Sequence, residues 1–146
     1  MSARDDVVSE ARRWIGTPYC HQASVIGAGA DCLGLLRGVW RAVIGTEPEV
    51  TPAYTEDWSE PSGREDLIAA AERFLLRKPS GHEESGDVLI FRMRSGMVAK
   101  HVGLAAQVGP RASFIHAYSG HGVVESALSG PWARRMAARF EFPKGV

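Results

Sequence analysis

The chain has 146 residues, 45% of them hydrophobic and 23% charged, which is the size and balance of one domain with a buried core. Its 17 basic and 17 acidic side chains cancel, so it lacks the positive charge with which proteins hold nucleic acid or anionic membranes. The charged N-terminus lacks the apolar stretch of a secretory signal, and no later run reaches the ~20 apolar residues of a membrane span.

The first half of the chain has the spacing of amphipathic helices. Residues 4–15 carry apolar side chains three or four apart behind two aspartates, which favour a helix N-terminus. Residues 32–44 repeat this spacing, with Asp31 in the N-cap position and Gly45 just past the end. Residues 62–65, Ser-Gly-Arg-Glu, have capping-box spacing ahead of a third helix of about four turns.

Two segments between these helices have no hydrophobic period, and we expect both to be surface loops. Residues 20–30 are mostly small, and residues 46–61 hold three prolines and several acids. Cys20 and Cys32 are spaced neither as a redox C-x-x-C pair nor as a regular zinc site. Two free thiols are expected in a reducing cytosol, while a disulfide between them stays open.

The second half of the chain changes to short β-friendly runs separated by Gly, Pro or Ser. These runs predict an antiparallel sheet of about five strands, at residues 88–92, 99–108, 112–118, 122–126 and 136–142. Helices followed by strands indicate an α+β fold, with N-terminal helices packed on one face of a C-terminal sheet. We expect residues 1–146 to form this single domain.

Cys32 is a candidate nucleophile because it begins the second predicted helix. Unpaired backbone N–H groups and the positive end of the helix dipole favour a thiolate there, and the same groups can stabilise an oxyanion. On its own, a cysteine at such a position is more often a small buried helix residue than a nucleophile. The alternatives are separated by whether a base lies nearby.

Two histidines in adjacent predicted strands are candidates for that base. If the hairpin turns on Val108 and Gly109, facing residue numbers sum to 217 and His101 lies opposite His116. One imidazole can then orient the other, and Cys32, His101 and His116 fill the roles of nucleophile, base and orienting group. Exposed histidines on the sheet surface remain the alternative.

Five segments of the chain stand out as short motifs: residues 14–19 (WIGTPY), 31–35 (DCLGL), 86–91 (GDVLIF), 101–104 (HVGL) and 114–117 (FIHA). In this order they resemble the blocks of the NlpC-type cell-wall peptidases. Three further segments, residues 19–22, 91–94 and 122–126, resemble the branch found in tail-gene clusters of phages and gene transfer agents.

The resemblance implies a papain-like core and hydrolysis of amide bonds in peptidoglycan stem peptides, commonly between D-glutamate and a diamino acid. It implies that Cys32 attacks the carbonyl, that His101 is its base and that His116 orients His101, with no metal or cofactor. Tyr19 matches a tyrosine near the oxyanion, although it is equally consistent with a core aromatic residue. Asp31 matches an acid that in some relatives meets a free substrate amine.

The resemblance also implies a setting for the protein. Made in the cytoplasm without a signal peptide, it would be carried in a phage-like particle by tail or baseplate proteins and act in the periplasm or cell wall. Two departures from the family pattern are a longer segment at residues 20–30, and Leu33 where many members have serine. With residues 46–61, that segment is expected to govern specificity. The alternatives are a structural tail or baseplate module, and an acyltransferase that uses the same thioester.

Overall fold

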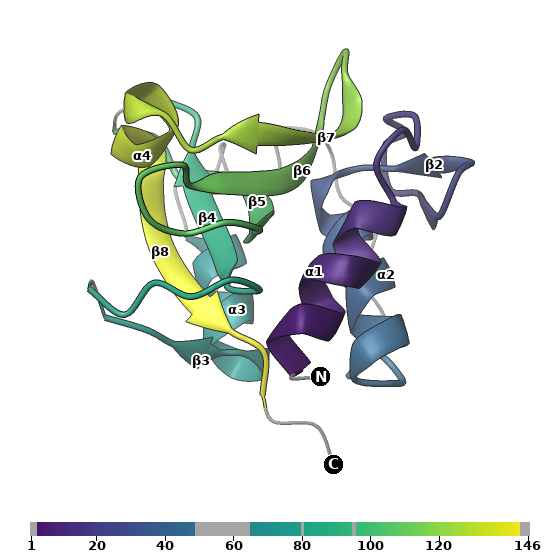
Figure 1. Ribbon diagram of the computed structural model, residues 1–146, viewed down its shortest axis with the longest axis horizontal. Coiled ribbons are helices and arrows are strands. Elements are labelled where there is room, and N and C mark those ends of the chain that lie inside the picture. Colours follow the sequence, from purple (N-terminus) through teal and green to yellow (C-terminus); the bar gives the residue numbers. More distant parts are fainter. Residues whose placement is uncertain (1–2, 49–64, 80, 95, 144–146) are drawn as a thin grey trace.

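The computed structural model describes residues 3–48, 65–79, 81–94 and 96–143. Within these residues, helices accompany an antiparallel sheet, so the predicted α+β class is confirmed (Figure 1). The helices are α1 (Ala3–Arg13), α2 (Cys32–Val43), α3 (Asp66–Phe74) and α4 (Gly130–Arg135). The strands of the main sheet are β3 (Leu76–Arg77), β4 (Val88–Arg92), β5 (Ala99–Ala105), β6 (Ser113–Tyr118), β7 (Gly122–Ala127) and β8 (Met136–Glu141).

The main sheet has six strands in the described residues rather than about five, in the order β3-β8-β4-β5-β6-β7. The predicted strands are β4 to β8. The additional strand, β3, has two residues and pairs with Phe140 and Glu141 of β8, so it is too short to show a period of its own. Strand β8, which follows all the other strands in sequence, therefore lies inside the sheet between β3 and β4.

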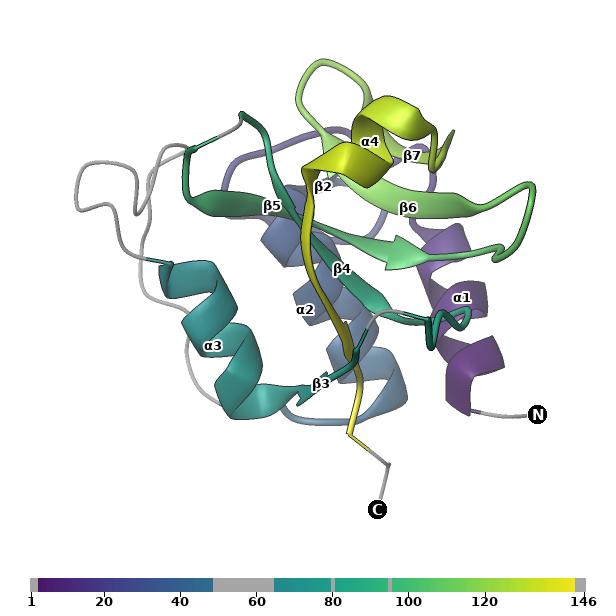
Figure 2. The same cartoon turned by 90° about the vertical axis from the view of Figure 1, so that its left-hand side faces the viewer.

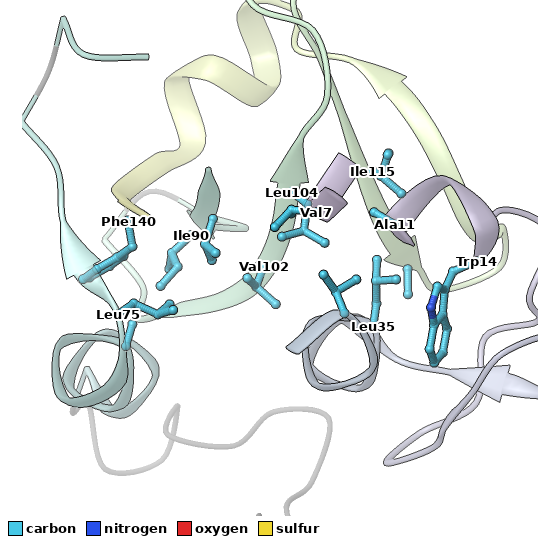
Figure 3. Close-up of a cluster of buried hydrophobic side chains, with 14 of the residues drawn as sticks. Val7, Ala11, Trp14, Leu35, Leu75, Ile90, Val102, Leu104, Ile115 and Phe140 are labelled. Carbon is cyan, nitrogen blue, oxygen red and sulfur yellow. The ribbon is translucent and has the colours of Figure 1, made fainter. Parts of the chain in front are cut away.

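Alternate side chains of the strands face two different cores. On one face, Val102 and Leu104 pack with α1, α2 and α3 in the larger hydrophobic cluster (Figures 2 and 3). On the other face, Phe91 and Phe114 pack with Trp132 of α4 in a smaller cluster. The prediction that the N-terminal helices pack on one face thus holds for α1 to α3, and α4, which was not predicted, lies on the other face.

Helix α3 is shorter than predicted and begins differently. Its nine residues start at Asp66, and the N-cap residue Glu65 makes no side-chain capping hydrogen bond. The Glu65 carboxylate instead accepts a hydrogen bond from the Ala99 N–H at 2.8 Å and pairs with Arg92. The predicted length of four turns is therefore wrong, and the Glu65 carboxylate ties the start of the helix to β4 and β5. Residues 49–64, with most of the predicted loop and Ser62 of the predicted capping box, lie outside the described residues.

A fully buried carboxylate, that of Asp87, connects segments that are far apart in the sequence. Asp87, just before β4, is 0% exposed. It accepts hydrogen bonds from Arg4 at 2.9 Å, from Lys78 at 3.0 Å, from Arg139 at 2.6 Å and from the Glu84 N–H at 2.9 Å. Burial by itself raises the pKa of Asp87, but these hydrogen bonds outweigh it and the pKa is lowered. Asp87 thereby connects α1, the segment after β3 and strand β8.

The hairpin between β5 and β6 has a different register from the predicted one. Leu104 pairs with Ile115, so facing residue numbers sum to 219 and the predicted sum of 217 is wrong. The turn is centred one residue later than expected, because Ser113 N–H closes the loop on the Gln107 carbonyl and Gly109 takes the positive φ of 91° within it.

This register separates the two histidines by one diagonal step. A Cβ built on Gly103 would lie 3.3 Å from the His116 Cβ, so His116 faces Gly103 rather than His101. The difference from the prediction is an even number of residues, and side chains alternate with a period of two. His101 and His116 therefore still lie on the same face of the sheet.

The segment predicted as a loop at residues 20–30 contains a small hairpin. Its strands are β1 (Ser24–Val25) and β2 (Gly29–Ala30). In Figure 1 this hairpin lies beside the N-terminal end of α2. None of the described helices has the length and apolar character that crossing a membrane requires.

Candidate active site

Helix α2 places Cys32 in its first turn, with Asp31 as the N-cap as predicted. One Asp31 carboxylate oxygen accepts a hydrogen bond from the Gly34 N–H and the other from the Gln22 N–H, both at 2.7 Å. Asp31 is 2% exposed. Asp31 therefore fixes both the start of the helix and the preceding hairpin segment, whereas contact with a substrate amine stays a prediction.

The Cys32 thiol lies against the backbone of β5 on both sides of His101. Its Sγ donates to the Lys100 carbonyl at 3.9 Å and receives a backbone hydrogen bond from Val102. The side chain is half-buried and packs against the larger core. The fold thus brings the nucleophile of α2 to the strand that carries the candidate base.

A separation of two strands makes room for this thiol. The ladder between β5 and β6 ends at Leu104 and Ile115. Because alternate residues of a strand direct their N–H and C=O groups toward the same neighbour, the groups of Lys100 and Val102 face β6 as those of Leu104 do. Beyond the ladder β6 no longer pairs with them, and the sulfur of Cys32 occupies that place.

The resting state of Cys32 differs from the thiolate expected at a helix N-terminus. Burial raises the pKa of Cys32 to about 12, and the Asp31 carboxylate acts in the same direction. Backbone hydrogen bonds from Val102 and Leu33 lower the pKa but do not compensate. The expectation of a thiolate is therefore wrong, and the thiol must lose its proton to a base as it attacks.

His101 and His116 are joined directly. The His101 Nε2 lies 2.8 Å from the His116 Nδ1, so one imidazole orients the other as predicted from their shared face. On its far side, the His116 Nε2 lies 2.9 Å from the Ser126 hydroxyl of β7. His116 is 0% exposed and His101 6%, so both are buried rather than surface histidines.

Trp132 of α4 covers this histidine pair. Its ring centroid lies 5.6 Å from that of His101 and 5.1 Å from that of His116. Tyr118 completes the enclosure, 6.0 Å from His101 and 5.4 Å from His116. Trp132 was not predicted as a site residue, because the sequence analysis did not predict α4.

This enclosure keeps both imidazoles neutral. Burial lowers the pKa of His101 to about 3, and the neighbouring His116 adds to the shift. Burial also lowers the pKa of His116 to about 4, with a further contribution from His121. A neutral imidazole beside a neutral thiol is the protonation state in which His101 can act as a base.

The buried pair makes stability depend on pH. The unfolded chain binds protons at these histidines near pH 6.5, whereas the folded chain does so only near pH 3 to 4. Their stabilisation is complete above pH 6.5 and is lost as the pH falls toward the folded values. We expect the free energy of unfolding at pH 5 to be lower by up to about 2 kcal/mol per histidine, measured by urea denaturation.

Two variants separate this effect from other titrations. His116→Gln removes one of the buried imidazoles and should reduce the slope of stability between pH 7 and pH 5. The exposed His82→Gln should leave that slope unchanged. A wild-type stability that is flat over this range would contradict the burial of two neutral imidazoles.

The remaining sequence candidates lie around the start of α2. Tyr19 bridges to Ala30 and packs, partly buried, against the larger core, and its role at an oxyanion stays a prediction. Cys20 is exposed, and both cysteines are free thiols as expected. Among the described residues, no three His, Cys, Asp or Glu side chains gather closely enough to hold a metal ion.

The basic residues that follow Trp132 differ in their surroundings. Arg134 and Arg135 are exposed. Arg139 is 9% exposed and reaches Asp87. Ser126 was missed as a site residue, because its contact with His116 depends on the register between two strands.

The comparisons with known proteins show where this fold occurs. No protein-family model matches the chain, and no curated protein sequence matches it. Among solved structures, an NlpC/P60 family protein from Bacillus cereus matches 97% of this chain with a TM-score of 0.67 and 20% identity. An NLP/P60 family protein similar to a lipoprotein, from Staphylococcus aureus, matches 98% with a TM-score of 0.64 and 17% identity.

The chain covers only part of these two structures, 40% of the first and 42% of the second. It covers 99% of an N-acetylmuramoyl-L-alanine amidase from Bacteroides uniformis, with a TM-score of 0.53 and 11% identity. The chain therefore has the fold of NlpC/P60 proteins.

Proposed function

We propose that this chain is a cysteine hydrolase that cleaves amide bonds in peptidoglycan. The observation that carries the proposal is that the Cys32 sulfur contacts the backbone on both sides of His101, whose imidazole is joined to that of His116, where β5 and β6 separate. The shared fold supports it, since the similar structures include NlpC/P60 proteins and an N-acetylmuramoyl-L-alanine amidase.

The geometry supports a mechanism that starts from a neutral thiol and a neutral imidazole. As Cys32 Sγ attacks the carbonyl carbon, His101 takes the thiol proton and the carbonyl oxygen becomes an oxyanion. The N–H groups of Cys32 and Leu33 are directed at the sulfur and can donate to that oxyanion. The Gly34 N–H is not available, because Asp31 occupies it.

Collapse of the tetrahedral intermediate completes the first half of the reaction. His101 gives its proton to the amide nitrogen as the C–N bond breaks, which releases the amine and leaves an acyl thioester on Cys32. A water molecule then loses a proton to His101 and attacks the thioester. That proton returns to the sulfur as the carboxylic acid product leaves.

For the substrate, we propose the stem peptide, with the bond between D-glutamate and a diamino acid as the preferred site. Support comes from the sequence resemblance to NlpC-type peptidases. The Bacteroides amidase in the same fold makes the bond between N-acetylmuramic acid and L-alanine the alternative. Both are amide bonds and need the same groups on the enzyme.

For the setting, we propose local opening of the cell wall by a phage-like tail, with tail or baseplate proteins as partners. The support is the resemblance of residues 19–22, 91–94 and 122–126 to the tail-associated branch.

The proposal is tested by digesting purified diaminopimelate-type peptidoglycan and resolving the products by mass spectrometry. Glycan strands that retain L-Ala-D-Glu, together with a free peptide beginning at diaminopimelate, identify the endopeptidase. A complete stem peptide free of glycan identifies the amidase. No product from folded protein, alone or on its particle, would contradict the hydrolase, and adducts with added glycinamide would indicate acyl transfer.

A further inference from the structure

A line of polar side chains crosses three neighbouring strands on the face that Trp132 covers. His101 lies on β5, His116 on β6 and Ser126 on β7. The His101 Nε2 is 2.8 Å from the His116 Nδ1, and the His116 Nε2 is 2.9 Å from the Ser126 Oγ. Both nitrogens of His116 are therefore engaged, one by each neighbouring strand.

Strand register places Ser126 in this line. In the β6–β7 ladder Ser126 faces Phe114, while His116 faces Val124. Ser126 is thus the diagonal neighbour of His116, and residues two apart on a strand share a face. The half-buried Ser126 hydroxyl can also reach solvent, whereas His116 is 0% exposed and cannot exchange its partner for bulk water.

We propose that Ser126 is a positioning residue whose hydroxyl oxygen accepts the Nε2 proton of His116 and so selects the histidine tautomers that make His101 a base. This inference rests on the proposed hydrolase function. It assigns Ser126 no contact with the substrate, and its action on Cys32 passes through two imidazoles.

The direction of the hydrogen bonds follows from which nitrogen of His101 must be free. His101 Nε2 is occupied by His116, and the sulfur of Cys32 lies against the backbone on both sides of residue 101. Nδ1 is the ring nitrogen next to the main chain, so Nδ1 must carry the lone pair that accepts the thiol proton.

The remaining protons are then determined in turn. With Nδ1 free, the neutral His101 carries its proton on Nε2 and donates it to the His116 Nδ1. His116 must then carry its own proton on Nε2, and the Ser126 oxygen accepts it. The opposite direction, with Ser126 donating, would place a proton on the His101 Nδ1 and remove the base.

The surroundings make this selection depend on Ser126. The pKa of each imidazole is lowered by burial, so neither ring escapes the choice of tautomer by becoming doubly protonated. The rings of Phe114 and Trp132 pack on His116 at centroid distances of 4.2 and 5.1 Å and offer no oxygen to replace the hydroxyl. A buried N–H without an acceptor is costly, so Ser126→Ala should disfavour the required tautomer.

The experiment is nitrogen NMR of protein labelled with ¹⁵N-histidine, which reports the proton on each ring nitrogen, together with the rate of peptidoglycan cleavage. We expect wild-type His116 and His101 both to be protonated on Nε2. Ser126→Ala should shift the His116 tautomer and lower kcat about tenfold at unchanged KM. Ser126→Thr keeps the hydroxyl and should restore both readouts.

Ser113→Ala is the matched control, because the Ser113 hydroxyl also bridges β6 and β7 but donates to Glu125 at 2.7 Å. It should change neither the tautomer nor kcat. Wild-type His116 protonated on Nδ1 would overturn the proposal even if Ser126→Ala failed to fold. A folded Ser126→Ala with wild-type tautomer and rate would also overturn it. Absence of any wild-type cleavage would instead count against the hydrolase, since the tautomers are measured independently.

Discussion

Replacing Cys32 with alanine is expected to lower the rate of peptidoglycan cleavage by at least ~10³-fold, because no acyl thioester can form without the sulfur. The substitution keeps Cβ, and it removes hydrogen bonds of the thiol with Lys100 and Val102 that do not define the helix. The fold should therefore persist. The measurement is the initial rate of fragment release, with circular dichroism to verify folding.

Cys20→Ala is the matched control for this loss. Cys20 is exposed, its N–H donates to the Ala30 carbonyl through the main chain, and alanine preserves that bond. Full activity is expected. An active Cys32→Ala enzyme would exclude the thioester mechanism at Cys32. An inactive but folded Cys20→Ala enzyme would show that the reaction depends on the Cys20 thiol, to which the mechanism gives no role.

Asp87→Asn should destabilise the fold by about 3 kcal/mol or more, the scale observed when one partner of a buried ionic cluster is removed. The substitution removes the negative charge that Lys78 and Arg139 surround, and these residues are 8% and 9% exposed. Two buried cations would then face each other across an amide. The free energy of unfolding, measured by urea denaturation at pH 7, gives the effect.

Glu72→Gln provides the comparison for Asp87. Glu72 pairs with Arg77 at 2.8 Å, but both side chains are about half exposed, at 53% and 52%. Exposed ion pairs contribute little, so a change below ~0.5 kcal/mol is expected. Equal effects of the two substitutions would show that the buried contacts of Asp87 stabilise the fold no more than an exposed ion pair does.

The sheet could be predicted from sequence to the extent that its strands carry their own signal. Runs of β-friendly residues between Gly, Pro and Ser located β4 to β8. Four short elements were not predicted: β1, β2 and β3 have two residues each, and α4 has six with a proline in its first turn. Elements this short form because neighbouring strands and the rings beneath Trp132 hold them, and that information lies outside their own residues.

The sequence could predict that His101 and His116 share a face of the sheet, but not how they are paired. They share a face whenever facing residue numbers sum to an odd number, and both the predicted sum of 217 and the observed sum of 219 are odd. The prediction that the two residues lie directly opposite each other required the sum of 217 and is wrong. The protonation states could not be predicted. They result from burial under Trp132 and against β5, which overrides the dipole of α2 at Cys32.

The place of β8 in the sheet order has a consequence for how the chain folds. Strands β3 and β4 do not pair with each other in the described structure; β8 lies between them, and Arg139 of β8 completes the contacts of Asp87. During synthesis, the pairing of β4 with β8 and the contact of Arg139 with Asp87 cannot form until residues Met136–Glu141 have been made. Until then β4 presents an open hydrophobic edge, so cooperative folding completes late, and contacts of such long sequence separation make it slow.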